Sequence, residues 1–205
     1  MKLIYGTTNK AKIDFMKRRL EPLGIKLLSL NDDGAPKLDI EKNGNSPLEN
    51  AKIKALAYYR ELKMPLFSCD SGLYIDGLDD ALQPGVNVRG VGDRMNDDET
   101  TAYYSELAAE FGGSLTARYK NAIVLILDET RVYEYMGDDI SGEPFLIVSK
   151  PHSKTRKEGY PIDPISVHIE SGKYYYDIDG YGETYENVDD GFAAFFSRFL
   201  GESLK

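Results

Sequence analysis

The first thirty residues alternate between two kinds of apolar pattern. Residues 2–8, KLIYGTT, form a short apolar run that ends in small polar residues, and residues 25–30, IKLLSL, form another such run. Between them, Ile13, Met16 and Leu20 recur at the spacing of one helical face. Short buried runs predict strands, so the chain is expected to open as strand, helix, strand. This opening favours an α/β protein with parallel strand pairing.

The remaining segments extend this pattern with further helices and with antiparallel strands. Ser46, Pro47 and Glu49 have the spacing of a helix cap, a first helical residue and a capping-box partner, and Asn96 and Glu99 repeat the cap and the box. The expected elements are a strand at 64–69, helices at 9–24, 46–62, 96–113 and 189–204, antiparallel strands over 116–150 with turns near 128–129 and 137–141, and a hairpin over 165–179.

We therefore expect a single domain over residues 1–205, of class α/β, with a central mixed sheet flanked by helices. The domain is expected to be elongated and two-lobed, with its second lobe built largely from about residues 116–180. A cleft between the lobes would fall near residues 7–12, 41–54, 70–72 and 151–164.

Composition excludes several classes of function. A net charge of -9 argues against duplex nucleic acid as the main partner, because phosphate backbones bind basic patches. Cys69 is the only cysteine, so an intrachain disulfide and a cysteine-rich zinc site are both excluded. No apolar run approaches the roughly 18–20 residues that span a membrane, and the apolar N-terminal run is too short for a signal peptide. We infer a cytoplasmic protein without membrane partners.

The segment TTNKAK, residues 7–12, is a candidate anion site. A strand end followed at once by a helix N-terminus directs unpaired N–H groups outward. Thr7, Thr8 and Asn9 add hydrogen-bond donors, and Lys10 and Lys12 add positive charge. An ordinary turn with an Asn cap and solvated lysines explains the same residues, and the segment is not a Walker phosphate loop.

The segment FSCDSG, residues 67–72, raises the same choice between structure and chemistry. Phe67, Ser68 and Cys69 are expected to end a strand, and Asp70 to begin a turn with Ser71 and Gly72. Because the end of a strand is a common place for a functional side chain, Asp70 is also a candidate for chemistry.

Three carboxylates are candidates for a divalent cation. Mg²⁺ binds a few carboxylates together with waters and substrate phosphates, which Glu41, Glu49 and Asp70 would satisfy. Each has an ordinary alternative: Glu41 as a solvated loop residue, Glu49 as the capping-box partner of Ser46, and Asp70 as a turn former.

A local group of cations stands out in this acidic chain. Lys150, Lys154, Arg156 and Lys157 lie in one loop, followed by Tyr160, whose ring can stack on a base. A solvated connector between hairpins is the alternative interpretation.

In order and spacing, four of these segments together resemble the inosine triphosphatase family, also called the Ham1 family. TTNKAK is similar to the family's Thr-x-Asn-x-x-Lys loop, and EKNGNSPLENAKIKA to its Glu-Thr-Gly…Glu-Asn-Ala-x-x-Lys-Ala segment. CDSGLYIDGLDDALQPGV resembles its Asp-Asp-Ser-Gly-Leu-x-Val-Asp-x-Leu…Pro-Gly-Val segment, and GYPIDP its Gly-Phe-Gly-Tyr-Asp-Pro segment.

The resemblance implies Mg²⁺-dependent hydrolysis of a nucleoside triphosphate, such as inosine, deoxyinosine or xanthosine triphosphate, to the monophosphate and pyrophosphate, by a homodimer. It implies that Asp70 is metal ligand and general base, and that Glu41 is a metal ligand. The implied substrate-binding residues are Thr7, Thr8, Asn9, Lys10, Lys12, Lys54, Ser71, Gly72, Arg89, Tyr160 and Asp163.

The chain departs from the family pattern at three places. Cys69 replaces the first aspartate of the Asp-Asp pair, and Ile162 replaces a pocket tyrosine. Residues 188–190, Val-Asp-Asp, stand where the family has Ser-His-Arg, which reverses the local charge. The sequence therefore predicts either a pyrophosphatase with altered base selection or a nucleotide-binding protein with weak activity.

Overall fold

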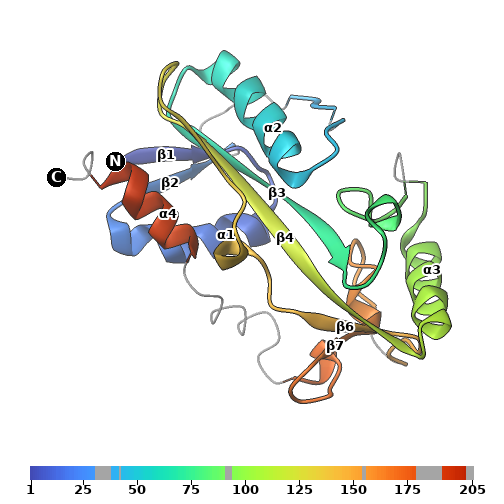
Figure 1. Cartoon of the computed structure of the whole chain (residues 1–205). Helices are drawn as coiled ribbons and strands as arrows, with labels where there is room; N and C mark the ends of the chain where they lie inside the picture. Colours follow the sequence, from blue (N-terminus) through green and yellow to red (C-terminus); the bar gives the residue numbers. More distant parts are fainter. Residues whose placement is uncertain (31–37, 42, 91–93, 154–155, 179–190, 202–205) are drawn as a thin grey trace. The chain divides into compact units, whose positions relative to one another are not determined.

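A computed structural model describes residues 1–30, 38–41, 43–90, 94–153, 156–178 and 191–201 (Figure 1). The strands are β1 Lys2–Tyr5, β2 Lys26–Ser29, β3 Leu66–Ile75, β4 Ser114–Ile126, β5 Val132–Tyr135, β6 Phe145–Val148 and β7 Ser166–His168. The α-helices are α1 Lys10–Leu20, α2 Pro47–Leu62, α3 Asp97–Glu110 and α4 Gly191–Leu200. In these described ranges no helix is long and apolar enough to cross a membrane.

The strands form one mixed sheet, as expected for an α/β protein. Its order is β2-β1-β3-β4-β6-β7, with β5 paired to β4. β1 pairs in parallel with β2 and with β3, which confirms the opening strand-helix-strand unit. β4 pairs antiparallel with β5 and β6, and β6 with β7, so the change to antiparallel strands is also confirmed.

The chain divides into two compact units, each described by itself. Unit 1 consists of Met1–Ser71, Lys120–Ser141 and Val188–Lys205, and unit 2 of Gly72–Tyr119 and Gly142–Asn187. The expectation of a single domain with two lobes stays a prediction.

The core of unit 1 has two sides. On one face of the strands, α1 and α4 pack over an aromatic group, where Phe67 stacks on Tyr5 with ring centroids 4.4 Å apart and meets Phe196 edge-on at 4.9 Å (Figure 1). On the other face, α2 packs through the small residues Ala51 and Ala55. Helices therefore cover both faces of the parallel strands, as parallel pairing requires.

Unit 2 has its own core under α3. Tyr104 of α3, Leu73 and Ile75 of β3, and Phe145 of β6 are buried together. Ile162 joins this cluster with an exposed fraction of 2%. An aliphatic residue at this position is therefore explained by packing in the core of unit 2.

The predicted helix caps are confirmed, with one difference. The side chain of Asn96 accepts from Glu99 N at 2.9 Å while the Glu99 carboxylate accepts from Asn96 N at 2.8 Å, a complete capping box. Ser46 caps α2 in the same way, accepting from Glu49 N at 3.2 Å. The Glu49 carboxylate, however, accepts from Asn45 N at 2.6 Å, so the predicted return bond reaches one residue further back.

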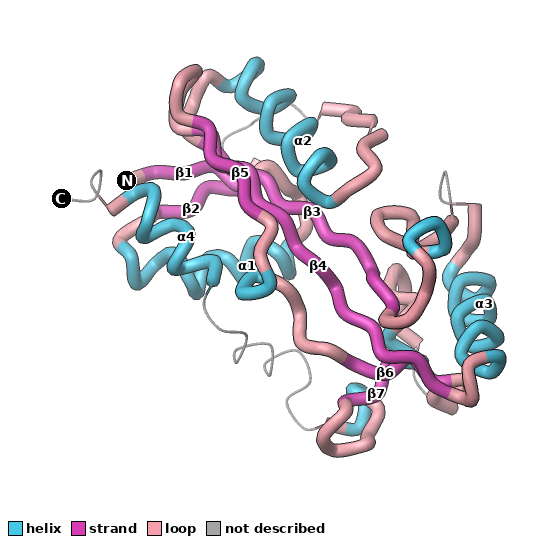
Figure 2. The backbone as a smooth tube through the Cα atoms, viewed as in Figure 1, coloured by secondary structure: helices cyan, strands magenta, loops and turns pink. Residues whose placement is uncertain are grey.

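The predicted strand end at Cys69 is wrong. β3 runs without interruption from Leu66 to Ile75, straight through Asp70, Ser71 and Gly72 (Figure 2). β1 pairs with β3 only at Leu66 and Phe67, and β4 is the neighbour of β3 on its other side in the sheet. That pairing outweighs the turn preference of an Asp-Ser-Gly sequence.

The predicted hairpin over 165–179 forms only in part. β7 ends at His168, and a single bridge joins Val167 to Tyr174 where a second strand was expected. The predicted turn is present: Gly172 has a φ of +65° and donates its N–H to the carbonyl of His168 at 2.9 Å. Because β7 has only three residues, it offers few backbone groups with which a second strand could pair.

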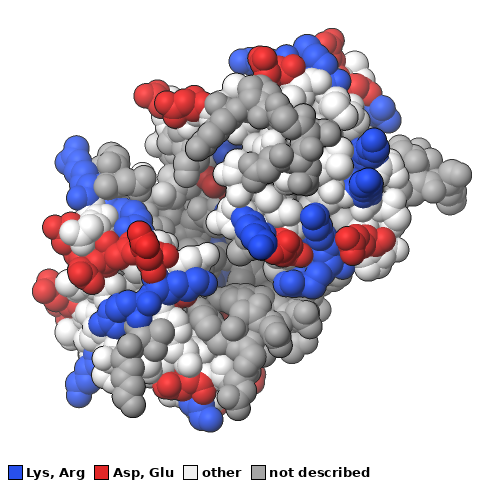
Figure 3. All heavy atoms as spheres, turned by 180° about the vertical axis from the view of Figure 1, so that it is seen from behind, with Lys and Arg blue, Asp and Glu red and all other residues white. Residues whose placement is uncertain are grey.

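Charges of both signs are mixed on the surface. Lys and Arg side chains lie next to Asp and Glu side chains over the described part of the face seen in Figure 3. This arrangement differs from the continuous basic stripe that binds a phosphate backbone.

We predict that Phe196→Ala lowers the free energy of unfolding by about 3–5 kcal/mol, because it removes a fully buried ring that contacts Phe67 edge-on and leaves a cavity in the core. Urea unfolding followed by circular dichroism measures the loss. Phe111→Ala, at a position 51% exposed, is the matched control and should change stability by no more than about 0.5 kcal/mol. Equal losses for the two variants would contradict the core assignment.

Candidate active site

The turn after β1 presents polar groups at the N-terminus of α1. Asn9 caps the helix, because its side-chain oxygen accepts a hydrogen bond from Lys12 N at 3.1 Å, and Thr7 Oγ1 accepts from Asn9 N at 3.2 Å. Thr8, Asn9 and Lys10 are exposed, and Lys12 is half-buried. N–H groups at a helix start, with lysines beside them, suit an anionic group such as phosphate.

A buried ion pair lies at the middle of β3. Asp70 is 8% exposed, and Lys54 reaches its Oδ1 from α2 with an Nζ–O distance of 3.1 Å. The same ammonium donates to the carbonyl of Cys69 at 2.6 Å. Burial is the main cause of the lowered pKa of Lys54, with Asp70 acting in the opposite direction and Lys12 in the same one. Lys54 is thus held close to both the carboxylate and the positive charge of Lys12.

Asp70 leaves one carboxylate oxygen available. Among the described residues, Lys54 binds Oδ1, and Oδ2 has no hydrogen-bond partner. Within the same residues, no three His, Cys, Asp or Glu side chains gather into a group that could hold a metal ion. Mg²⁺ in phosphate chemistry takes one or two carboxylates and completes its shell with waters and phosphate oxygens. Asp70 fits that donor set, with Glu41 as the second predicted carboxylate.

Gly44 and Asn45, just before α2, are held against the start of that helix. Gly44 N donates to Asn50 Oδ1 at 3.0 Å, and a Cβ on Gly44 would lie 2.7 Å from Glu49 Cβ. Glu41 itself is exposed. The Glu49 carboxylate is bound to Asn45 N, so its structural role at the helix start accounts for this residue.

Cys69 faces the opposite side of β3 from Asp70. Its thiol lies in the aromatic core of unit 1, hydrogen-bonded to Tyr5, and burial raises its pKa to about 11. Burial also raises the pKa of the Tyr5 hydroxyl. Cys69 is therefore a neutral core residue at the position where the family pattern has an acid.

Ser71 is held by a residue that the sequence did not reveal. Ser71 Oγ donates to Asn121 Oδ1 at 2.7 Å, and Asn121 Nδ2 donates to the carbonyl of Ile140 at 2.7 Å. Fifty residues separate Ser71 from Asn121, and no local motif marks Asn121, so only the pairing of strands brings the two together. Gly72 follows in β3 and is buried.

Three further candidates lie in unit 2. The Arg89 guanidinium is paired with Asp97 of α3. The exposed ring of Tyr160 carries Lys157 Nζ 3.8 Å from its centroid. Asp163 begins a short 3₁₀ turn, Asp163–Ile165.

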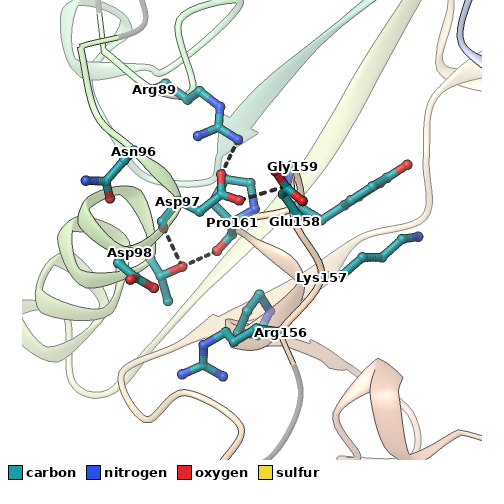
Figure 4. A pocket seen from close by; sticks show the side chains of 12 residues that line it. Arg89, Asn96, Asp97, Asp98, Arg156, Lys157, Glu158, Gly159 and Pro161 are labelled. Atoms are coloured by element: carbon teal, nitrogen blue, oxygen red, sulfur yellow. Dashed lines mark hydrogen bonds and ion pairs between the residues drawn. The ribbon is translucent and has the colours of Figure 1, made fainter.

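Arg89 and Tyr160 both line a cavity of about 740 Å³ in unit 2 (Figure 4). Its other walls come from the start of α3 and from residues 156–161, including Arg156 and Lys157 of the predicted basic loop. The volume is within the range of small-molecule sites, but the lining is mostly charged and polar, where such sites are usually mostly apolar.

The sequence of the chain was compared with those of known protein families. The sequence pattern of the Ham1 family matches residues 3–176. The chain belongs to the Ham1 family. The fold agrees: a Ham1 protein from Coxiella burnetii superimposes with a TM-score of 0.74 and 25% sequence identity, over 98% of this chain and 99% of that one.

Relatives in the Ham1 family carry a named activity. A dITP/XTP pyrophosphatase of Thermus thermophilus is 31% identical over 176 residues, which is 84% of this chain and 79% of that protein. The dITP/XTP pyrophosphatase of Aquifex aeolicus is 40% identical over 86 residues, but the match spans only 42% of this chain and 40% of that protein.

The structure places the predicted site residues in two groups. Unit 1 contains Asp70, Glu41, the turn of residues 7–12, Lys54 and Ser71, and unit 2 contains Gly72, Arg89, Tyr160 and Asp163. Their roles stay predictions. Residues 188–190, which replace the Ser-His-Arg of the Ham1 family, and Lys154 of the basic loop lie outside the described residues.

We predict that Cys69 of the folded protein reacts with iodoacetamide at least about 100-fold more slowly at pH 8 than a free cysteine with a pKa near 8.5, because burial and a pKa of about 11 keep it a thiol. Mass spectrometry measures the rate, and the chain has one cysteine, so each adduct reports this site. Protein unfolded in guanidinium chloride is the control. Equal rates in the two states would contradict a buried Cys69.

Proposed function

We propose that this protein is a nucleoside triphosphate pyrophosphatase that converts a purine nucleotide, such as inosine, deoxyinosine or xanthosine triphosphate, with Mg²⁺ to the monophosphate and pyrophosphate. The names of its Ham1 relatives support this reaction. The observation that carries the proposal is the buried Lys54–Asp70 pair: among the described residues the carboxylate has one oxygen without a hydrogen-bond partner, and Lys54 lies within electrostatic reach of Lys12.

The turn after β1 would bind the phosphates. Lys10 and Lys12 supply positive charge, and the backbone N–H groups at the start of α1 supply donors. Negative charge increases on the leaving pyrophosphate as its bond breaks, so these groups stabilise the transition state more than the ground state.

Asp70 would act as the general base. Its Oδ2 takes a proton from the attacking water while the water oxygen bonds to the α-phosphorus, and the bond to the bridging oxygen breaks with its electron pair leaving on pyrophosphate. Lys54 keeps the carboxylate in place through Oδ1. Mg²⁺, held by Asp70 and Glu41, would neutralise phosphate charge when bound.

The remaining candidates would recognise the nucleoside. Ser71 and Gly72 follow Asp70, the proposed general base, in β3. Tyr160, Asp163 and Arg89 would contact the purine ring of the nucleotide, and Tyr160 and Arg89 line the cavity in unit 2. The replacement of Ser-His-Arg by Val-Asp-Asp at 188–190 changes the local charge, so we propose that base selection differs from that of other Ham1 proteins.

A nucleotide-binding protein with weak activity is the second candidate. Two departures from the family pattern favour it: the uncharged core residue Cys69 in place of an acid, and the acids at 189–190. Action in the cytoplasm and assembly as a homodimer also stay proposals from sequence and family resemblance.

We predict that Asp70→Asn lowers kcat by about 100- to 10,000-fold, because the amide cannot accept the proton of water. Thermal unfolding should shift to a lower temperature, because the amide oxygen still accepts the Lys54 hydrogen bond but leaves that buried ammonium without its counter-charge. Far-UV circular dichroism checks that the variant is folded at the assay temperature. Pyrophosphate release measures kcat, and Asp80→Asn, an exposed aspartate outside the candidate site, is the matched control. An Asp70→Asn enzyme with wild-type turnover would show that another group is the base.

We predict Mg²⁺-dependent pyrophosphate release from at least one nucleotide in a panel of inosine, deoxyinosine, xanthosine, standard, methylated and pyrimidine triphosphates, and its loss on adding EDTA. The preferred nucleotide identifies the base. Nucleotide binding without pyrophosphate release, in every condition, would reject the enzyme in favour of the binding protein.

A further inference from the structure

The carboxylate of Asp97 joins two segments that are distant in the sequence. One oxygen, Oδ1, accepts from the guanidinium of Arg89. The other, Oδ2, accepts from the backbone N of Gly159 at 2.7 Å (Figure 4). Asp97 is the first residue of α3, so the helix start holds both the 85–90 segment and the loop that carries Tyr160.

One helical turn later, Thr101 holds the same loop at a second point. Its Oγ1 lies 2.7 Å from the carbonyl oxygen of Pro161, and it also lies 2.9 Å from the helix carbonyl of Asp97. Thr101 is buried, with an exposed fraction of 6%. Asp97 and Thr101, here called the α3 clamp, therefore bind the residues directly before and after Tyr160.

The backbone between the two points is itself constrained. Gly159 has a φ of +84°, a conformation that favours glycine, and Tyr160 N donates to the carbonyl of Lys157 at 3.0 Å. Tyr160 then projects its ring outward, with an exposed fraction of 37%. Hydrogen bonds to backbone atoms on both sides of Tyr160 thus constrain the backbone position from which its ring projects.

The helix that carries the clamp is well anchored. The complete capping box of Asn96 and Glu99 fixes its first turn, and Tyr104 OH donates to the carbonyl of Val88 at 3.1 Å. The hydrogen bonds from Gly159 N and Arg89 lower the pKa of Asp97, so its carboxylate keeps its charge at neutral pH.

We propose that Asp97 and Thr101 are positioning residues that set base selection by fixing the direction of the Tyr160 ring. This inference rests on the proposed function, in which Tyr160 contacts the purine. Stacking by itself discriminates little between bases, because every base has a flat face. A ring held in one place fixes where the edge of the stacked base lies, so that the polar groups lining the cavity distinguish one base from another. Loss of the clamp should therefore reduce discrimination between bases and weaken nucleotide binding, while the proton transfer at Asp70 is unchanged.

The test uses two pairs of variants. Thr101→Val removes the hydroxyl at nearly constant volume, and Thr101→Ser restores it. Asp97→Ala removes both bonds of the carboxylate. Glu106→Ala, at an exposed acid of the same helix that does not line the cavity, controls for the loss of one negative charge from α3.

For Asp97→Ala and Thr101→Val we expect KM for the preferred nucleotide to rise about tenfold or more with a smaller change in kcat, and the ratio of kcat/KM between purine bases to fall towards one. Thr101→Ser and Glu106→Ala should keep the wild-type values. Hydrogen exchange should speed up at residues 157–162 in the first two variants only. Unchanged base ratios and unchanged exchange in Asp97→Ala would overturn the proposal.

Failure of the proposed function gives a different result. If the wild type releases no pyrophosphate, the same variants are compared by their Kd for the panel, using non-hydrolysable triphosphate analogues. If the ratio of Kd between nucleotides with different bases falls towards one in Asp97→Ala, the α3 clamp is supported although the protein is not an enzyme. Ratios that stay at the wild-type values would reject the clamp as well.

Discussion

The buried contact between Lys54 and Asp70 is the interaction on which the candidate site depends. A carboxylate in the middle of a central strand is unfavourable unless a partner replaces the water it loses. Lys54 is that partner, and it is held in turn by the carbonyl of Cys69. Removing one member of such a pair typically costs about 3–5 kcal/mol, because the other charge is left buried. The same contact thus joins α2 to β3, and among the described residues it leaves one oxygen of Asp70 without a hydrogen-bond partner.

Local signals predicted those parts of the fold that depend on neighbouring residues. The opening strand-helix-strand unit follows from two apolar runs and one helical face. The caps at Asn9, Ser46 and Asn96 follow from side chains that bind N–H groups three residues ahead. These contacts close within one helical turn, so the sequence alone contains all of their partners.

Features that depend on distant partners were missed or wrongly predicted. Asp70, Ser71 and Gly72 look like a turn, yet they continue the extended strand β3, which lies beside β4 in the sheet. The role of Asn121 depends on Ser71, which lies fifty residues earlier in the chain. The role of Asp97 depends on Gly159, which lies sixty-two residues later. Both residues are ordinary polar residues in their own segments. The family resemblance supplied the remaining candidates, because the spacing of the carboxylates by itself favoured no role over another.

The two groups of candidate residues are held by different kinds of structural element: a strand and a helix in unit 1, and a loop in unit 2. This difference affects how base selection can change. Asp70 and Lys54 belong to a central strand and a helix and are tied to each other, so a change in either disturbs the core of unit 1. Tyr160 stands on a loop held by hydrogen bonds to backbone atoms, and the neighbouring Ile162 fills the core of unit 2. A side chain on such a loop is replaced at little cost in folding, since the bonds that hold the loop do not involve it. The departure from the Ham1 pattern at Ile162 is compatible with a retained carboxylate and lysine in unit 1, because Ile162 belongs to the core of unit 2.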